Sequence, residues 1–167
     1  MIYFVTENYL KSSTPITQNV SATDIMPFIK PSASGWMQNI LGTYFFNHLL
    51  TAYNAQTLTT DEEALVQKIQ PAVAWRAVVD CVLGLTYQLK NKGLQKQNGD
   101  NSEAPEQAET TFVMRHYEQK AEFYESMVRK YLKMNKDLFP EYTSKLNKDS
   151  ELAPQQDDNF NSDMFFV

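Results

Sequence analysis

Apolar residues in this sequence recur every three or four positions over much of its length, which is the spacing of one face of a helix. The repeat is most regular between residues 105 and 136, where we expect a long helix. Its core stripe consists of Val113, Tyr117, Ala121, Tyr124, Val128 and Tyr131, widened by Phe112, Phe123, Met127 and Leu132. The pattern predicts an all-α fold, a small helical bundle.

Further helices are expected before this one. A helix that begins within residues 19–23 should kink or divide at Pro31, because proline cannot donate a backbone hydrogen bond. Gly42 is expected to end it, with a second helix over residues 44–54. Residues 91–104 are rich in glycine and polar side chains, which predicts a flexible loop.

The central helix has the clearest predicted start. Thr60 and Glu63 have the spacing of a capping box, so we expect a helix from about residue 61 to about residue 90. Residues 72–89 are apolar almost all round, as in a helix that is covered on most sides. Asp80 and Arg76 are the exceptions, and their i, i−4 spacing predicts an ion pair within the helix or between subunits.

The two ends of the chain differ from the body. Residues 1–18 are expected to form an extended N-terminal arm, with at most one short helical turn, and residues 19–136 the helical domain. Residues 137–167 are expected to form a flexible acidic tail, with seven acids against Lys145 and Lys148, whereas residues 1–136 hold 13 acids and 13 bases. A neutral body with an acidic tail argues against specific nucleic-acid binding.

Aromatic residues make up 13% of the chain, and several lie where the core of a small bundle is not expected to reach. Aromatic and methionine side chains commonly anchor interfaces. The terminal cluster could dock on a partner or fold back on its own body, and we favour docking. The candidate partner-binding residues are Tyr3, Phe4, Phe139, Tyr142, Phe160, Met164, Phe165, Phe166 and Val167.

The sequence contains no recognisable catalytic or metal-binding motif. His48 and His116 have no second histidine or cysteine at ligand spacing, and we expect each to be an ordinary packed or surface histidine. The lone Cys81 excludes an internal disulfide and is expected to be buried. No segment has the charge pattern of a signal peptide or the apolar length of a membrane span. We therefore expect a soluble protein that is not an enzyme and binds neither cofactor, metal nor membrane.

Several short segments occur in a characteristic order along the chain. They are 5–11 (VTENYLK), 14–20 (TPITQNV), 27–31 (PFIKP), 40–43 (ILGT), 58–65 (LTTDEEAL), 69–75 (IQPAVAW), 91–93 (NKG) and 121–124 (AEFY). Their order and spacing resemble small connector-like proteins of Bacteroidetes phages, including crAss-like phages. The resemblance covers roughly residues 5–132, and the segment after about 137 has no counterpart in it.

This resemblance implies a structural subunit of a phage head–tail connector, an adaptor ring of about twelve copies that binds the portal and further tail or ring proteins. It would be assembled in the cytoplasm of the host bacterium and reside in the virion. The alternative is a small cytoplasmic regulatory or adaptor protein that binds a host or phage partner. An enzyme would need a polar cluster around Asp80, His48 or Arg76.

Overall fold

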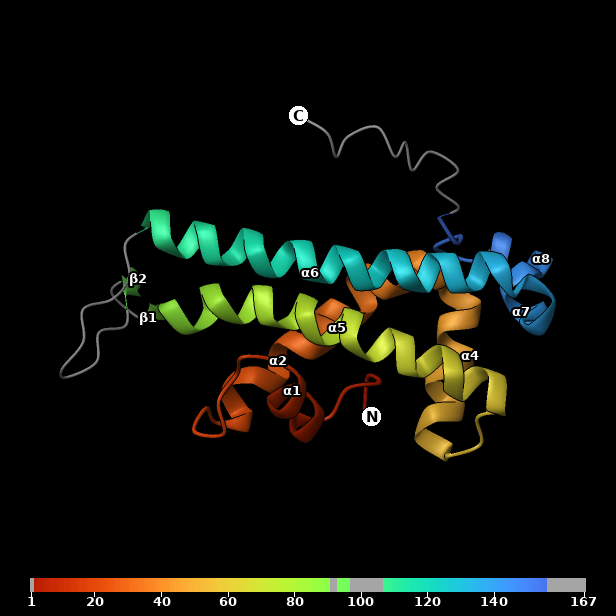
Figure 1. Cartoon of the computed structure of the whole chain (residues 1–167), viewed down its shortest axis with the longest axis horizontal. Helices are drawn as coiled ribbons and strands as arrows, with labels where there is room; N and C mark the ends of the chain where they lie inside the picture. Colours follow the sequence, from red (N-terminus) through yellow and green to blue (C-terminus); the bar gives the residue numbers. More distant parts are fainter. Residues whose placement is uncertain (1, 91–92, 97–106, 156–167) are drawn as a thin grey trace.

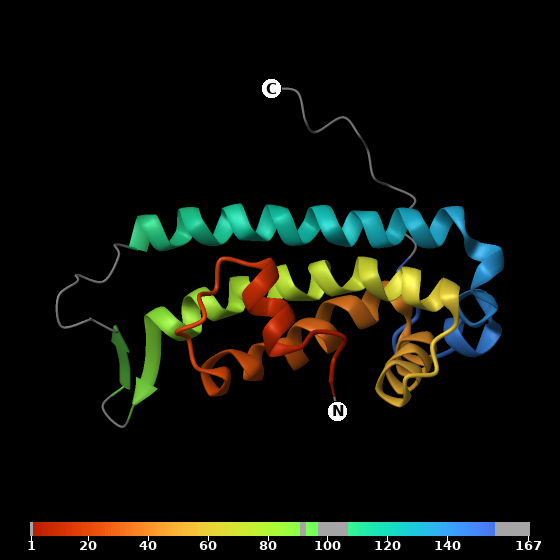
Figure 2. The same ribbon diagram turned by 60° about the horizontal axis from the view of Figure 1, so that its bottom comes forward.

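Two long antiparallel helices form the centre of the fold (Figure 1). The computed structural model describes residues 2–90, 93–96 and 107–155. Helix α5 (Thr60–Thr86) packs along helix α6 (Gln107–Met134), and α1 (Glu7–Ser13) and α2 (Ala22–Ser32) lie against the other side of α5 (Figure 2). The predicted all-α fold class is confirmed.

Helix α5 is central because apolar residues cover nearly its whole circumference. Residues 72–79, a run of eight in which only Arg76 is polar, are all buried. By length and composition alone α5 could cross a membrane, a possibility that the sequence analysis did not identify, but 56% of its most apolar window is buried inside this fold. A helix covered by neighbours has the same composition, so the composition of α5 is explained by its place in the core.

The predicted capping box of α5 is wrong by one residue. Thr59, and not Thr60, accepts the backbone N–H of Glu62 on its hydroxyl at 3.3 Å, and its own N–H donates to Glu62 Oε2 at 2.8 Å. His48 Nε2 lies 2.7 Å from the other oxygen of Glu62. The reciprocal pair therefore joins the start of α5 to helix α4 (Thr43–Ala55).

Near Pro31, where the sequence predicted a kink or a division, the α-helix changes into a π-helix. Helix α2 continues directly into a π-helical turn, η1 (Ala33–Met37), and then α3 (Gln38–Leu41). In the π-helical turn the N–H of Gln38 donates to the carbonyl of Ala33, five residues earlier. The predicted stop at Gly42 is confirmed, and its φ of 82° and ψ of 151° are angles that almost only glycine adopts.

At the opposite end of the central pair, α5 stops at Thr86, about four residues earlier than predicted. Strand β1 (Tyr87–Lys90) pairs antiparallel with β2 (Gly93–Lys96), which gives a two-stranded hairpin within the segment expected to be partly helix and partly loop. The rest of the predicted loop lies outside the described residues. The hairpin is a small addition to an otherwise helical architecture.

The N-terminal segment is folded against the body and is not the expected extended arm. Phe4 and Val5 are fully buried, and Leu10 of α1 joins the same core. The ring of Phe4 packs edge-on against Phe46 at 5.7 Å between centroids, and the Phe4 carbonyl accepts a 2.9 Å hydrogen bond from Gln70. This segment is therefore part of the core.

The first part of the expected acidic tail is also folded. A 3-10 turn, η2 (Lys136–Leu138), leads into α7 (Pro140–Thr143) and α8 (Lys145–Lys148). These elements pack beside α4 (Figure 1), and we call residues 136–155 the C-terminal hook. Residues 156–167, the remainder of the predicted tail, lie outside the described part of the chain.

Asn147 fastens the hook to the turn between α3 and α4. Its side chain is fully buried; its amide donates to the carbonyls of Leu41 (2.8 Å) and Tyr142 (2.9 Å), and its oxygen accepts the N–H of Phe45 at 3.1 Å. Thr43 N–H donates to the carbonyl of Leu152 at 2.8 Å. These contacts satisfy backbone groups at the helix ends around Gly42 that would otherwise have no partner.

Candidate functional site

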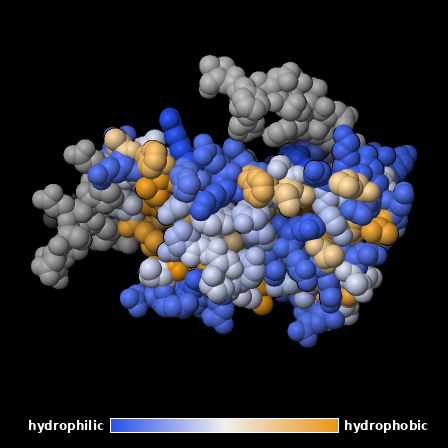
Figure 3. All heavy atoms as spheres, in the orientation of Figure 1, coloured by the Kyte–Doolittle hydropathy of each residue, from blue (hydrophilic) through white to orange (hydrophobic). Residues whose placement is uncertain are grey.

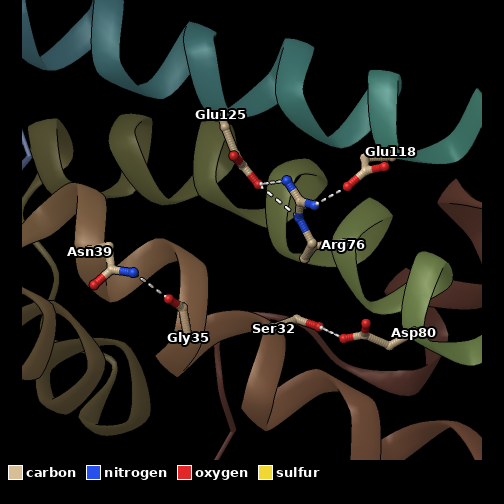
Figure 4. Close-up of polar contacts among 7 residues, drawn as sticks. All are labelled: Ser32, Gly35, Asn39, Arg76, Asp80, Glu118 and Glu125. Carbon is tan, nitrogen blue, oxygen red and sulfur yellow. Dashed lines mark hydrogen bonds and ion pairs between the residues drawn. The ribbon is translucent and has the colours of Figure 1, made fainter. Parts of the chain in front are cut away.

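A buried arginine of α5 pairs with two carboxylates of α6 at the middle of the molecule (Figure 4). Arg76 of α5 is 3% exposed. Its Nη2 and Nε lie 2.8 and 3.0 Å from Glu125 Oε1, and its Nη1 lies 3.4 Å from Glu118 Oε1. Both carboxylates belong to α6. The guanidinium therefore pairs with two acids of the neighbouring helix, an arrangement that offsets the cost of burying its charge.

The π-helical turn places an indole on the same guanidinium. The ring of Trp36 lies 4.0 Å from Arg76 Cζ, a cation–π distance, while 48% of Trp36 is exposed. Asn39 Nδ2 donates to the carbonyl of Gly35 at 2.7 Å and so supports the turn (Figure 4). π-helical turns are frequent at functional sites. This turn holds the partly exposed indole of Trp36 against the buried guanidinium of Arg76.

The ion pair between Arg76 and Asp80 that was expected within α5 is not formed, whereas the alternative of a pair between subunits stays a prediction. Asp80 Oδ2 instead lies 3.2 Å from the hydroxyl of Ser32, which also donates to the carbonyl of Phe28 at 2.7 Å. Burial raises the pKa of the Asp80 carboxyl, and the Ser32 hydrogen bond and the Arg76 charge act against that rise. The prediction was wrong because the two acids of α6 offer Arg76 closer partners than its own helix does.

The chemistry available to this cluster is limited by how fully its groups are engaged. The guanidinium of Arg76 already has two carboxylates and an indole as neighbours. Within the described ranges, no group of three histidine, cysteine, aspartate or glutamate side chains could hold a metal ion. Burial raises the pKa of the Cys81 thiol to about 12, which keeps it protonated and unreactive. The cluster is best described as a structural clamp that presents Trp36.

The candidate partner-binding aromatics have three different placements. Phe4, Phe139 and Tyr142 are 0%, 1% and 6% exposed, so the expectation that the core does not reach them is wrong. Phe139 and Tyr142 pack on Phe45 with centroids 5.9 and 5.8 Å apart. Tyr3 is half-buried and packs against the core. The remaining candidates lie outside the described residues: Phe160, Met164, Phe165, Phe166 and Val167.

A set of exposed apolar side chains on α6 was not predicted. Phe112, Phe123, Met127 and Met134 of α6 are 74%, 59%, 41% and 74% exposed. At about 100° per residue their side chains fall within an arc of about 60°. We call these four residues the outer stripe. Figure 3 shows light-orange spheres, among blue ones, along the edge that α6 occupies in Figure 1.

The outer stripe faces away from the core. Ala121, Val128 and Leu132 are fully buried against the bundle, and the same helical arithmetic places them about 100–180° from the stripe. The sequence analysis had placed Phe112, Phe123 and Met127 on the core side of α6, and that prediction is wrong. The exposed side chains of His116 and Lys130 fall within the same arc, so the stripe is a row of separate apolar side chains among polar ones. Exposed phenylalanine and methionine side chains on one face are typical of interaction surfaces.

The sequence of the chain was compared with known protein families, curated proteins and solved structures. A model described as a family of unknown function (DUF6712) matches residues 37–151, more than half of the chain. The chain belongs to this family. No curated protein and no solved structure matches it. The matched range of DUF6712 ends at Glu151 and so includes α7 and α8, in agreement with the packing of the C-terminal hook on the body.

Proposed function

We propose that this member of the DUF6712 family is a structural subunit of a tailed-phage head–tail connector, one copy in a ring that binds the portal. The outer stripe of α6 carries the proposal. A long helix with four exposed Phe and Met side chains offers the apolar anchors that protein interfaces use. The resemblance of residues 5–132 to connector-like phage proteins supplies the biological setting.

A closed ring requires two different surfaces on each subunit, because each copy contacts its two neighbours heterologously. The outer stripe is one candidate. Trp36 is another, since it is half exposed and lies over Arg76, on a different flank from the stripe. Aromatic residues on rigid supports lose little conformational entropy when they bind. The Arg76 clamp fixes Trp36 in this way.

The assembled state tests the proposal directly. We expect the purified protein to form a defined oligomer, alone or with portal protein, when its mass is measured in solution at micromolar concentration. The substitution Phe112→Ser should weaken that assembly, whereas Leu146→Ser should not, because Leu146 is 64% exposed but lies on α8. A monomer that persists with and without portal protein would contradict the proposal.

The place of the protein in infected cells gives a second test. A connector subunit should be detected by mass spectrometry in purified particles, at a stoichiometry similar to that of the portal. A protein found only in the lysate of infected cells, and absent from particles, would instead favour the regulatory adaptor, which could use the same apolar face on one partner.

A further inference from the structure

The outer stripe has no cover within the described fold. Its four side chains extend over residues 112–134, about 33 Å of helix at 1.5 Å per residue. The described helices that pack against α6 lie on the opposite side of it (Figures 1 and 2). Four exposed large apolar side chains are unfavourable in water, and the chain itself supplies a segment that could cover them.

The described chain ends on the flank of α6. The carbonyl of Gln155 accepts a 2.8 Å hydrogen bond from Arg129 Nη1, and the N–H of Gln155 donates to the carbonyl of Asn39 at 2.9 Å. Arg129 lies at the level of Met127 along α6, although its side chain leaves the helix about 160° round from that of Met127. The described chain therefore ends on α6 itself, on a different flank from the stripe, and the segment that follows must pass round the helix to meet it.

The length of the following segment suits the stripe. Residues 156–167 can span at most about 40 Å when extended. The rise from Arg129 to Phe112 along α6 is about 25 Å. Every residue of the stripe is therefore within reach of this segment without any change in the described fold.

The chemistry of the segment is complementary to that surface. Its apolar residues match the stripe in type, and it also carries three acids. Lys130 and Lys133 are exposed on the C-terminal half of α6, where no acidic residue lies between Glu125 and Asp137. The apolar residues of the segment are Phe160, Met164, Phe165, Phe166 and Val167, and its acids are Asp157, Asp158 and Asp163.

We propose that residues 156–167 bind the outer stripe of their own chain and cover it in the free subunit, which is the alternative to docking on a partner that the sequence left open. Attachment at Gln155 gives the segment a high effective concentration at this surface, which favours its own chain over a second copy. This inference depends on the surface of α6 and not on the connector function. If the protein is also a connector subunit, a neighbouring subunit that binds α6 must first displace residues 156–167. The segment would then inhibit premature assembly.

Photo-crosslinking of the full-length protein tests this contact. The residue p-benzoylphenylalanine replaces Phe165, and a mixture of equal parts of unlabelled and ¹⁵N-labelled protein is irradiated in the absence of any partner. We expect crosslinks to α6 between Phe112 and Met134 in peptide pairs of a single isotope. Pairs of mixed isotope would show that the segment binds a second copy, and would overturn the proposal.

Two variants test whether the crosslinks depend on the side chains of the stripe. The double substitution Phe123→Ser and Met127→Ser should weaken docking roughly tenfold and lower the crosslink yield accordingly. Leu146→Ser, which removes an equally exposed apolar side chain from α8, should leave the yield unchanged. Circular dichroism confirms that each variant is folded. Crosslinks that fall elsewhere on the body, or no crosslinks at all, would also overturn the proposal, whatever the protein does in a particle.

Discussion

The side chain of Asn147 occupies the space that a Cβ atom on Gly42 would need. Gly42 separates α3 from α4 with backbone angles of φ 82° and ψ 151°, and Asn147 comes from the far end of the described chain. A glycine is therefore required at this turn for two reasons, its conformation and its neighbour. The pair joins the C-terminal hook to the body.

Replacing Asn147 by alanine should destabilise the fold by about 2–4 kcal/mol, because the substitution leaves buried backbone groups of Leu41, Phe45 and Tyr142 without partners. The free energy of unfolding in urea measures the effect. Asn135→Ala is the matched control: Asn135 makes one 2.9 Å hydrogen bond to the carbonyl of Tyr131 at the end of α6, and its loss should cost about 1 kcal/mol.

Gly42→Ala should be less harmful when Asn147 is already alanine. In the native protein the new methyl group meets both a strained backbone and the Asn147 side chain, whereas in the Asn147→Ala background only the backbone strain remains. A double-mutant cycle on the free energies of unfolding measures this coupling. Additive effects of the two substitutions would contradict the close approach.

Arg76→Gln should destabilise the protein by about 3–5 kcal/mol, because it leaves the carboxylate of Glu125 buried without its cation. Burial already raises the pKa of the Glu125 carboxyl, against the lowering effect of Arg76. An acid with a raised pKa binds more protons in the folded than in the unfolded state, so stability falls as pH rises above the ordinary value of about 4.5.

Without Arg76 that fall should become steeper, since the folded pKa of Glu125 rises further. Unfolding curves at several pH values between about 4.5 and 7 test this. Adding Glu125→Gln to Arg76→Gln should restore part of the stability and flatten the pH dependence. A double variant as unstable and as pH-sensitive as Arg76→Gln alone would show that Glu125 is not the group responsible.

Thr59→Ala should cost about 1 kcal/mol and Thr60→Ala less than about 0.5 kcal/mol, because Thr59 caps α5. Burial acts to raise the pKa of Glu62, but the Thr59 N–H and His48 outweigh it and the pKa is lowered. A carboxyl with a lowered folded pKa stabilises the protein above its ordinary pKa of about 4.5, and that contribution is lost as pH falls through the folded value.

Glu62→Gln is the matching pH experiment. The difference in free energy of unfolding between the native protein and this variant should be largest at neutral pH and should shrink as the pH is lowered below about 4.5. Equal differences at all pH values would show that the carboxylate charge of Glu62 contributes nothing to the cap.

Phe4→Ala should destabilise the fold by about 3–5 kcal/mol, as expected for a fully buried ring. The Phe4 ring packs on Phe46 and Tyr53. Tyr3→Ala, at the neighbouring half-buried position, should cost about 1 kcal/mol or less. Thermal unfolding compares the two. Similar small effects would show that the N-terminal segment is attached only loosely.

Local patterns predicted the helices well and their long-range contacts poorly. The stop at Gly42 and the change near Pro31 follow from the conformations of single residues, and both are present. The capping box was misplaced because Thr59-Glu62 and Thr60-Glu63 have the same spacing, and only the contact of Glu62 with His48 distinguishes them.

The placement of the aromatics required information that the sequence pattern does not carry. Phe4 and Phe139 stand in stretches without helical periodicity, yet both are buried by segments far away in the chain. The reverse error on α6 had a local signal, since Phe112 and Phe123 are about 20° apart on a helical wheel and far from Ala121. Periodicity found the core face, but the other apolar residues were assigned to it without that check.

The C-terminal hook also determines how the subunit would bear a pull. Tension applied to the chain beyond Gln155 is divided between α6, through Arg129, and the segment around Gly42, through Asn39 and Thr43. The two hydrogen bonds of Gln155 are loaded first, and the bond between Thr43 and Leu152 only after they break. A pull on this end is therefore passed to two different helical elements before it reaches α8.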